Sequence, residues 1–187
     1  MDFMLDLETL SSQPDAAIVA IGICTFSHVD AAEGRQRHKF YKVIDPESAQ
    51  RSGGRIDAAT VQWWMRQDLA ARSVFNAGVA FTIDEALNSA HQFIRSFGER
   101  PRVWGNGASF DNVILRGAYE RLGLKAPWEF RDERCYRTLK NLYRDIAFEA
   151  TGVAHHALDD AISQAIHAER IFYAMAKLWF FSATRTG

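Results

Sequence analysis

Three apolar segments with the length and composition of β-strands lie in the first quarter of the chain. They cover about residues 2–7, 17–26 and 36–44, and a polar stretch with Asp30 and Gly34 separates the second segment from the third. Consecutive strands joined by short turns pair side by side in antiparallel fashion. The first part of the chain is therefore expected to form a three-stranded antiparallel meander.

The remaining pattern predicts helices that alternate with short strands. Residues 45–56, which include Pro46, are expected to form a loop, and Asp57 is expected to cap a helix to about residue 68. The segment from Thr82 to Glu85 predicts a capping box for a helix to about residue 97. The further predicted elements are a short helix near 70–76, a strand at 102–105, a helix at about 110–122 with Ser109 as its cap, a weak strand near 128–131, a helix over about 135–147 and a last helix over about 158–179.

The order of these elements predicts an α/β protein. Three antiparallel strands followed by strand–helix crossovers give a mixed five-stranded sheet with helices on both faces, which resembles the ribonuclease H-like architecture. A length of 187 residues fits a single domain over residues 1–187. The apolar side of the last helix is expected to carry Ile162, Ile166, Ile171, Met175 and Leu178. Phe180 and Phe181 extend this helix and suggest a homodimer.

The composition is that of an ordinary globular protein, with 48% hydrophobic and 24% charged residues. The formal net charge of −1 excludes a strongly basic nucleic-acid-binding protein. Positive charge is nevertheless concentrated in residues 116–144, with eight Lys or Arg against four acids, and in residues 35–55, with six against two. Such patches either follow a phosphate backbone or form the solvated faces of helices and hairpins.

Cysteine content and the two ends of the chain bear on its compartment. Cys24 and Cys135 are far apart and form neither a disulfide framework nor a metal-type pair, which fits a reducing environment. The first residues lack the basic segment of a signal peptide. Glu169, Arg170 and Lys177 interrupt the apolar C-terminal stretch and argue against a membrane span. We therefore expect a cytoplasmic protein that does not enter the membrane.

Two carboxylates one residue apart, Asp6 and Glu8, lie at the end of the first apolar run. Side chains alternate along a strand with a period of two, so these acids point to the same side of the sheet. Two anions side by side repel each other unless a cation lies between them, and oxygen ligands suit magnesium or manganese. The alternative for an isolated Asp-x-Glu is a pair of exposed acids at the end of a strand.

Two further segments carry candidate chemistry. Asp111 follows a glycine-bearing loop and lies in the first turn of a helix, where the helix dipole favours an ionised acid. His155 precedes Asp160 by five residues at the start of the last helix. Each segment alone also has a plain structural explanation, as an N-terminal helix acid and as a surface histidine.

In this order, the four acids and the histidine resemble the DEDDh family, the DnaQ-like 3′–5′ exonucleases of the ribonuclease H-like superfamily. The motifs are Asp6-Leu-Glu8-Thr9, Ser109-Phe-Asp111-Asn112 and His155 followed by Asp160. The run from Gly105 to Asn112 and the Trp63-Trp64 pair are similar to a phage and bacterial subgroup of exodeoxyribonuclease VIII-like proteins or small exoribonucleases. His156 and Asp159 are neighbours of the assigned pair, and the family spacing selects His155 with Asp160.

The resemblance implies metal-dependent cleavage of phosphodiester bonds. Two Mg²⁺ or Mn²⁺ ions would be held by Asp6, Glu8, Asp111 and Asp160. His155 would act as general base on the attacking water, since imidazole titrates near neutral pH. The products would be nucleoside 5′-monophosphates, released one at a time from the 3′ end of DNA or RNA, either single-stranded or as an overhang.

The resemblance also implies how the terminal nucleotide is bound. Glu8 and Thr9 would contact the terminal sugar, and Leu10 would wedge against the last base. Ser109 and Phe110 of the second motif are further candidates, with Phe110 packing either on the substrate or in the core. Trp63 would stack a base or line a dimer interface, unless one of the adjacent tryptophans is buried and the other partly covered.

Three rival functions fit parts of the pattern. A catalytically silent nucleic-acid-binding domain of the same fold would be expected to lack at least one of the five active-site residues, and all five are present. A metal-dependent phosphomonoesterase of the haloacid dehalogenase type begins with Asp-x-Asp-Thr, whereas this chain has Glu8 at the third of these positions. A ribonuclease H-type endonuclease lacks the His-x4-Asp ending.

Overall fold

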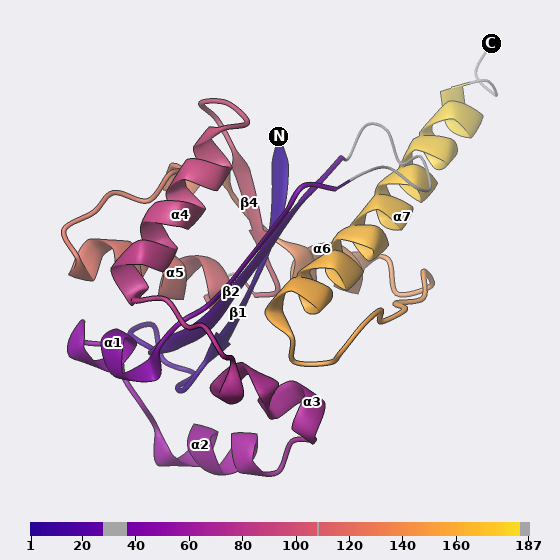
Figure 1. Ribbon diagram of the computed structural model, residues 1–187. Coiled ribbons are helices and arrows are strands. Elements are labelled where there is room, and N and C mark those ends of the chain that lie inside the picture. The colour runs from indigo at the N-terminus through magenta and orange to yellow at the C-terminus, as the bar shows by residue number, and fades with distance from the viewer. Residues whose placement is uncertain (28–36, 108, 184–187) are drawn as a thin grey trace.

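The computed structural model describes residues 1–27, 37–107 and 109–183, with side chains up to residue 177. Its centre is one mixed sheet in the order β3-β2-β1-β4-β5 (Figure 1). The strands are β1 (Asp2–Thr9), β2 (Ile18–Phe26), β3 (Lys39–Val43), β4 (Arg102–Gly105) and β5 (Glu133–Cys135). The pairs β1–β2 and β2–β3 are antiparallel, whereas β1–β4 and β4–β5 are parallel. The predicted mixed five-stranded sheet is confirmed, although the predicted turn with Asp30 and Gly34 lies outside the described residues.

Helices lie on both faces of this sheet. They are α1 (Pro46–Arg51), α2 (Ala58–Met65), α3 (Leu69–Arg72), α4 (Ile83–Arg95), α5 (Asp111–Arg121), α6 (Tyr136–Leu142) and α7 (Ala157–Ala183), with 3₁₀ turns at Ser73–Asn76 and Phe130–Asp132. In Figure 1, α4 and α5 lie on one side of the sheet, α6 and α7 lie on the other, and α2 and α3 lie near the end at which β1 terminates. None of these helices, in the described part of the chain, combines the length and apolar character that a membrane span requires.

The alternation of side chains along β1 separates the apolar core from the acids. Phe3 and Leu5 belong to the main core, which α4 and α5 complete on one face. Met4 belongs to a second cluster, which includes Ala161, Ala165 and Ala168 of α7. Because the period is two, Asp6 and Glu8 lie on the same side of the sheet as Met4, toward α7.

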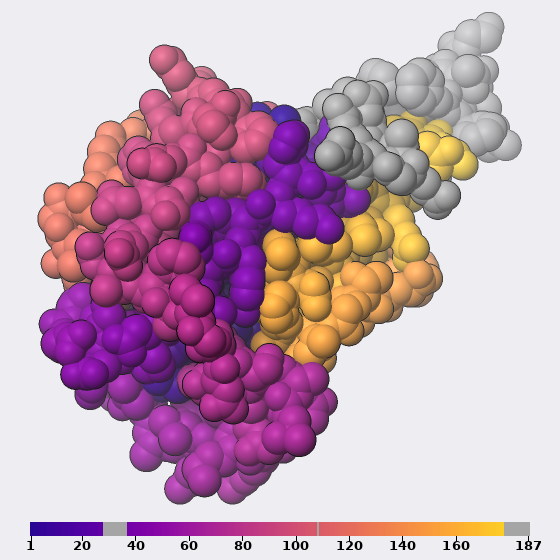
Figure 2. Space-filling model, viewed as in Figure 1, coloured from indigo at the N-terminus to yellow at the C-terminus, as the bar shows by residue number. Residues whose placement is uncertain are grey.

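Small side chains bring α7 close to the sheet. Four alanines about one turn apart have no exposed surface: Ala157, Ala161, Ala165 and Ala168. Gly22 of β2 allows this approach, because a Cβ there would lie 2.2 Å from the carbonyl carbon of Ala157. Figure 2 shows the first turns of α7 packed beside the antiparallel strands.

The predicted apolar side of this last helix is only partly right. Ile171 is buried, but Ile162, Ile166 and Met175 are partly exposed, since the alanines make the closest contact. The side chains of Leu178, Phe180 and Phe181 lie outside the described residues.

Three segments differ clearly from the sequence prediction. Residues 45–56 are not all loop, because α1 begins at Pro46 and the Asp45 carboxylate caps it by accepting two backbone N–H bonds. The strand expected near 128–131 forms at Glu133–Cys135, where it pairs with β4. The helix expected to reach residue 147 ends at Leu142.

Two predicted helix caps have different outcomes. Thr82 and Glu85 form the predicted capping box of α4. Asp57 precedes α2, but its carboxylate accepts hydrogen bonds from Ser11 and Arg55 and does not cap the helix. The bond from Ser11 connects the loop after β1 to the segment just before α2.

Candidate active site

Three of the predicted acids converge at the end of β1. Asp6 and Glu8 come from the strand, and Asp160 comes from the first turn of α7. One carboxylate oxygen of each residue lies within 4.8 Å of those of the other two. The convergence follows from the alternation along β1 and from the close approach of α7, which bring all three acids to one side of the sheet.

The fourth acid, Asp111, is held beside this group by backbone N–H groups. Its Oδ1 accepts a bond from the N–H of Leu7 at 3.2 Å, and its Oδ2 accepts one from Asn106 at 2.8 Å. It is the first residue of α5, and the N-cap position before it is Phe110. The prediction that Ser109 caps this helix is therefore wrong, and Ser109 is exposed.

His155 lies just before α7 in the left-handed conformation, with φ at 62°. This conformation costs a non-glycine residue about 1 kcal/mol, so neighbouring contacts must hold it. The backbone N–H of His155 donates to Oδ2 of Asp160 at 3.0 Å. Its ring packs edge-on against Trp63, with 4.9 Å between the ring centroids. These contacts fix the imidazole at the edge of the acidic group.

The tryptophan pair on α2 connects this histidine to β1. Trp64 is 3% exposed, and its indole Nε1 donates to the carbonyl of Thr9 at 2.9 Å. Its ring lies 5.0 Å from that of Trp63, which is 40% exposed. One tryptophan is thus buried and supports the other, which is partly open to solvent.

The neighbouring His156 and Asp159 have other partners. The ring of His156 packs on Tyr41, with 4.3 Å between centroids. The carboxylate of Asp159 accepts a backbone N–H bond from the loop before α7. The pair that the family spacing selects, His155 and Asp160, is the pair beside the other acids.

The carboxyl groups in this cluster have raised pKa values. Burial raises the pKa of Glu8 to about 8, and the negative charges of Asp160 and Asp111 add to the shift. Burial and then the three neighbouring acids raise the pKa of Asp6 well above its ordinary value. Burial raises the pKa of Asp111 to about 6, although its backbone N–H bonds oppose the shift. The pKa of Asp160 is also raised, chiefly by burial. A cation among these groups would relieve their repulsion.

Gln164 belongs to the site, although no motif marked it. It follows Asp160 by one helical turn and is 4% exposed. Its Nε2 donates to Oδ1 of Asp6 at 2.7 Å, and its Oε1 is buried without a hydrogen-bond partner among the described residues. The signal that could have found it is the spacing of four residues from a predicted acid on the same helix.

A cleft of about 430 Å³ opens over the acids. The predicted substrate contacts Glu8, Thr9, Phe110 and Trp63 line it. Its further lining residues are Asp6, Leu7, Thr60, Trp64, Asn106, Tyr136, Lys140, Phe148, His155, Asp160 and Gln164. The cleft therefore has a floor of acids, one wall from α2 and another from α6 and α7.

Two predicted substrate contacts lie outside this cleft. Ser109 does not line it. Leu10 is 7% exposed and lines an adjacent apolar pocket of about 350 Å³, which shares Trp64 with the cleft. Leu10 thus lies next to the cleft, and its contact with a base stays a prediction.

The acidic group fits a divalent metal ion. Mg²⁺ and Mn²⁺ prefer carboxylate oxygens, and three such oxygens within 4.8 Å of one another are close enough to share an ion. Because the carboxyl groups have raised pKa values, metal binding would displace protons from them.

Comparison with known proteins places the chain among exonucleases. The sequence profile of the 3′-5′ exoribonuclease Rv2179c-like domain matches residues 1–172. A sequence search of curated proteins found no match. Among solved structures, the nuclease domain of 3′hExo, a DEDDh family member bound to rAMP, is similar with a TM-score of 0.63 and 13% identity over 92% of each chain.

Two more solved structures are similar. A full-length 3′-exonuclease has a TM-score of 0.57 and 12% identity over 92% of this chain and 81% of that chain. Cell-death related nuclease 4 has a TM-score of 0.51 and 14% identity over 92% of this chain and 64% of that chain. These likenesses show the fold, and the profile match covers nearly the whole sequence. The chain therefore belongs to the Rv2179c-like 3′-5′ exoribonuclease domain family and is a metal-dependent exonuclease.

Proposed function

We propose that the protein removes nucleoside 5′-monophosphates one at a time from the 3′ end of a DNA or RNA strand. The observation that carries the proposal is the convergence of the oxygens of Asp6, Glu8 and Asp160 within 4.8 Å, with His155 fixed beside them. Clustered carboxylates next to an imidazole have the chemistry that phosphodiester hydrolysis requires.

The acids would hold two divalent ions, Mg²⁺ or Mn²⁺. Asp6, Glu8 and Asp160 are the main ligands, and Asp111 completes the set from the edge of the group. When bound, the ions would stabilise negative charge on the scissile phosphate and on the leaving 3′-oxygen. Neutralisation of the carboxylates would also let a polyanion approach them.

His155 is the proposed general base. Its contacts with Asp160 and Trp63 hold the imidazole ready to accept a proton from the attacking water. The water oxygen then bonds to phosphorus, and the bond from phosphorus to the 3′-oxygen of the preceding nucleotide breaks. The terminal residue leaves as a 5′-monophosphate, and the shortened strand keeps a 3′-hydroxyl.

The size of the cleft suits a chain end. Its volume of about 430 Å³ is within the range of small-ligand sites, so it can accommodate one nucleotide. Glu8 and Thr9 are the candidates for contact with the terminal sugar. The exposed part of Trp63 and the half-buried Phe110 are the candidates for contact with a base.

The test is a degradation time course on 5′-labelled single-stranded DNA and RNA of one sequence, with Mg²⁺, Mn²⁺ or EDTA. We expect a metal-dependent ladder that shortens from the 3′ end, and the faster substrate identifies the preferred sugar. His155→Ala is expected to stop turnover while the protein stays folded. A fully active His155→Ala variant would remove His155 from the mechanism.

The other outcomes are equally distinct. Immediate release of a labelled mononucleotide would mean attack from the 5′ end, and internal fragments would mean an endonuclease. Binding of the strand without any cleavage would identify a catalytically silent nucleic-acid-binding domain. Hydrolysis of a terminal phosphate alone would identify a phosphomonoesterase.

A further inference from the structure

Two basic residues of α6 border the cleft. Lys140 lines it together with Asp6 and Glu8. Arg137 lies about one turn earlier on the same helix, and its guanidinium carbon is 3.5 Å from the position that a Cβ would occupy at Gly107. Arg137 therefore lies over the loop that leads from β4 to α5 and its acid.

Ion pairing distinguishes these two cations from many other basic residues. Among the described side chains, those of residues 1–27, 37–107 and 109–177, neither Arg137 nor Lys140 forms an ion pair with a carboxylate. Paired examples elsewhere are Arg51 with Glu47, Arg55 with Asp57, Arg102 with Asp2, Arg116 with Glu133, Lys125 with Glu129 and Arg170 with Glu149. Burial raises the pKa of Asp111 and the positive charge of Arg137 acts to lower it, but neither cation is held in an ion pair, so both can contact an anion from solution.

The two cations also repel each other. The pKa of Lys140 is lowered, first by partial burial and then by the positive charge of Arg137. Like charges about one turn apart destabilise a helix. Because α6 has only seven residues, the two charges act on a short helix. A doubly contacted anion, such as a phosphodiester group, would relieve this repulsion.

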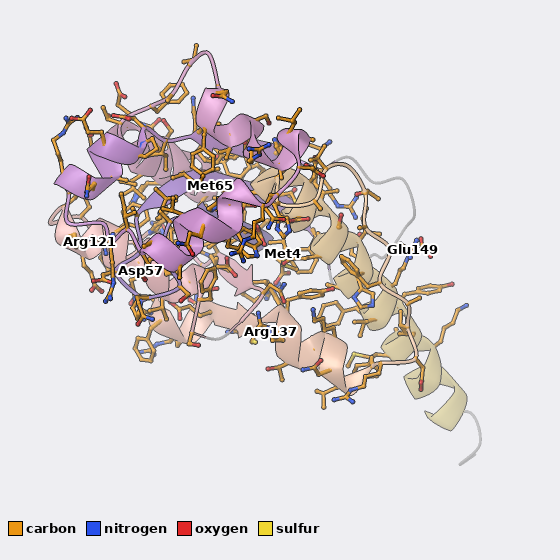
Figure 3. The ribbon with its side chains drawn as sticks, turned by 90° about the horizontal axis from the view of Figure 1, so that it is seen from below. Met4, Asp57, Met65, Arg121, Arg137 and Glu149 are labelled. Carbon is orange, nitrogen blue, oxygen red and sulfur yellow. The ribbon has the colours of Figure 1, made fainter. Side chains whose placement is uncertain are left out.

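The opposite wall of the cleft is aromatic. It is formed by α2, where Trp63 is 40% exposed. Figure 3 looks at the end of the sheet where β1 terminates, and it shows Met65 of α2 and Arg137 of α6 on opposite sides of Met4. A nucleic-acid strand has bases on one side and phosphates on the other, so an aromatic wall facing a cationic wall matches its two sides.

We propose that Arg137 and Lys140 bind the phosphodiester groups immediately upstream of the terminal nucleotide, so that the strand leaves the cleft along α6. Guanidinium and ammonium groups both donate charge-assisted hydrogen bonds to phosphate oxygens. The inference rests on the proposed function, because it requires a strand whose 3′ end lies over the acids. It assigns the backbone to α6 and the bases to α2.

The experiment compares two substrates of different length. The first is a short labelled oligonucleotide, and the second is the p-nitrophenyl ester of thymidine 5′-monophosphate, which has no upstream phosphate. We expect Arg137→Ala and Lys140→Ala each to raise KM for the oligonucleotide, with a loss of kcat/KM about tenfold larger than the loss for the ester. Arg131→Ala is the matched control, because Arg131 is an exposed cation outside the cleft. It should leave KM and kcat/KM for both substrates unchanged.

Binding without turnover tests the same site independently. In an Asp6→Asn background, fluorescence anisotropy should show weaker oligonucleotide binding for each α6 variant. The slope of the logarithm of the binding constant against the logarithm of the salt concentration should fall in magnitude by about one. Equal losses on both substrates, or unchanged binding with an unchanged salt slope, would overturn the assignment. If the unaltered protein cleaves neither substrate, the proposed function fails, and the anisotropy measurement still decides whether α6 binds phosphates.

Discussion

Two aspartates on β1, four residues apart and on the same side of the sheet, have opposite environments. Asp2 is 2% exposed, and its carboxylate accepts two bonds from Arg102 at 2.7 Å and one from the indole of Trp104 at 2.9 Å. Asp6 faces other acids, and the side-chain donor that the described residues supply to it is Gln164. The same residue type on the same strand is therefore neutralised at one end and left uncompensated at the other.

This difference indicates a structural role for Asp2 and a functional role for Asp6. A buried carboxylate that is paired and hydrogen-bonded contributes to folding, whereas one that faces like charges raises its pKa and opposes folding when ionised. The fold tolerates the second arrangement because a divalent cation from solution can complete it. Asp2 is thus expected to matter for stability and Asp6 for activity.

Replacing each of the two carboxylates by an amide should have the largest and most different effects. Asp6→Asn removes a metal ligand, so we expect a loss of exonuclease activity on the order of a thousandfold or more. It also removes like-charge repulsion, so the metal-free protein should be at least as stable as the original. Activity would be followed on a labelled oligonucleotide, and stability by urea unfolding.

The matched change, Asp2→Asn, should have the reverse effect. It weakens the pairing of a buried carboxylate with a partly exposed guanidinium, so we expect a loss of about 1–3 kcal/mol in the free energy of unfolding. Turnover by the folded protein should change little. If Asp2→Asn lost as much activity as Asp6→Asn, the division of roles along β1 would be wrong.

Gln164→Leu should weaken metal binding, because it removes the side-chain donor to Asp6. Residues that orient a metal ligand typically change metal affinity by about 10–100-fold, and we expect a loss of Mg²⁺ affinity near the lower figure. The measurement is the Mg²⁺ concentration for half-maximal activity together with calorimetric metal binding. Ser163→Ala is the control, because this buried neighbour bonds to Thr151 and not to Asp6. Equal effects of the two changes would make Gln164 a packing residue.

A dependence of stability on pH should follow from the raised carboxyl pKa values. Their folded-state values, about 8 for Glu8 and about 6 for Asp111, exceed the ordinary ones, so the protonated forms are favoured by folding. This contribution is present at low pH and is lost as the pH rises through these values.

Without metal, Tm should therefore fall by about 5–10 °C between about pH 5 and pH 8. Mg²⁺ should reduce this fall, since it binds the deprotonated carboxylates. Thermal unfolding by circular dichroism, in Mg²⁺ and in EDTA, would measure both curves. Parallel curves would show that metal binding does not involve these groups.

The smallest expected effects come from the indole N–H groups near the two ends of β1. Trp64 donates to the carbonyl of Thr9, and Trp104 donates to Asp2. Each Trp→Phe change should cost about 1–2 kcal/mol of stability. Trp64→Phe should also lower kcat several-fold, because Trp64 supports Trp63 and His155, whereas Trp104→Phe should leave kcat unchanged. If Trp64→Phe and Trp104→Phe had equal kcat values, Trp64 would have no role in the active site.

The strand acids could be predicted from the sequence because their placement depends on local geometry. Alternation along one strand is enough to put Asp6 and Glu8 on the same side. The start of a long helix is enough to put His155 near Asp160. The start of α1 also had a local signal that the prediction missed, since Asp45 followed by Pro46 is typical of a helix N-terminus.

Features that depend on how elements pack could not be predicted in this way. The bond from Gln164 to Asp6 exists because Gly22 and the buried alanines let α7 approach the sheet. The position of Lys140 in the cleft likewise depends on where α6 packs. Serine is a residue type that often caps helices, but α5 starts two residues after Ser109. It begins at Asp111, whose carboxylate accepts a bond from the backbone N–H of Leu7 in β1. Tertiary contacts override the local preference at that point.

Calorimetric titration of Mn²⁺ into the original protein, Asp6→Asn and Asp2→Asn measures whether the uncompensated acids of β1 hold the metal. We expect binding with proton release for the original protein and for Asp2→Asn, and at least about tenfold weaker binding for Asp6→Asn. Indistinguishable titrations of all three proteins would show that the uncompensated acids of β1 do not hold the metal.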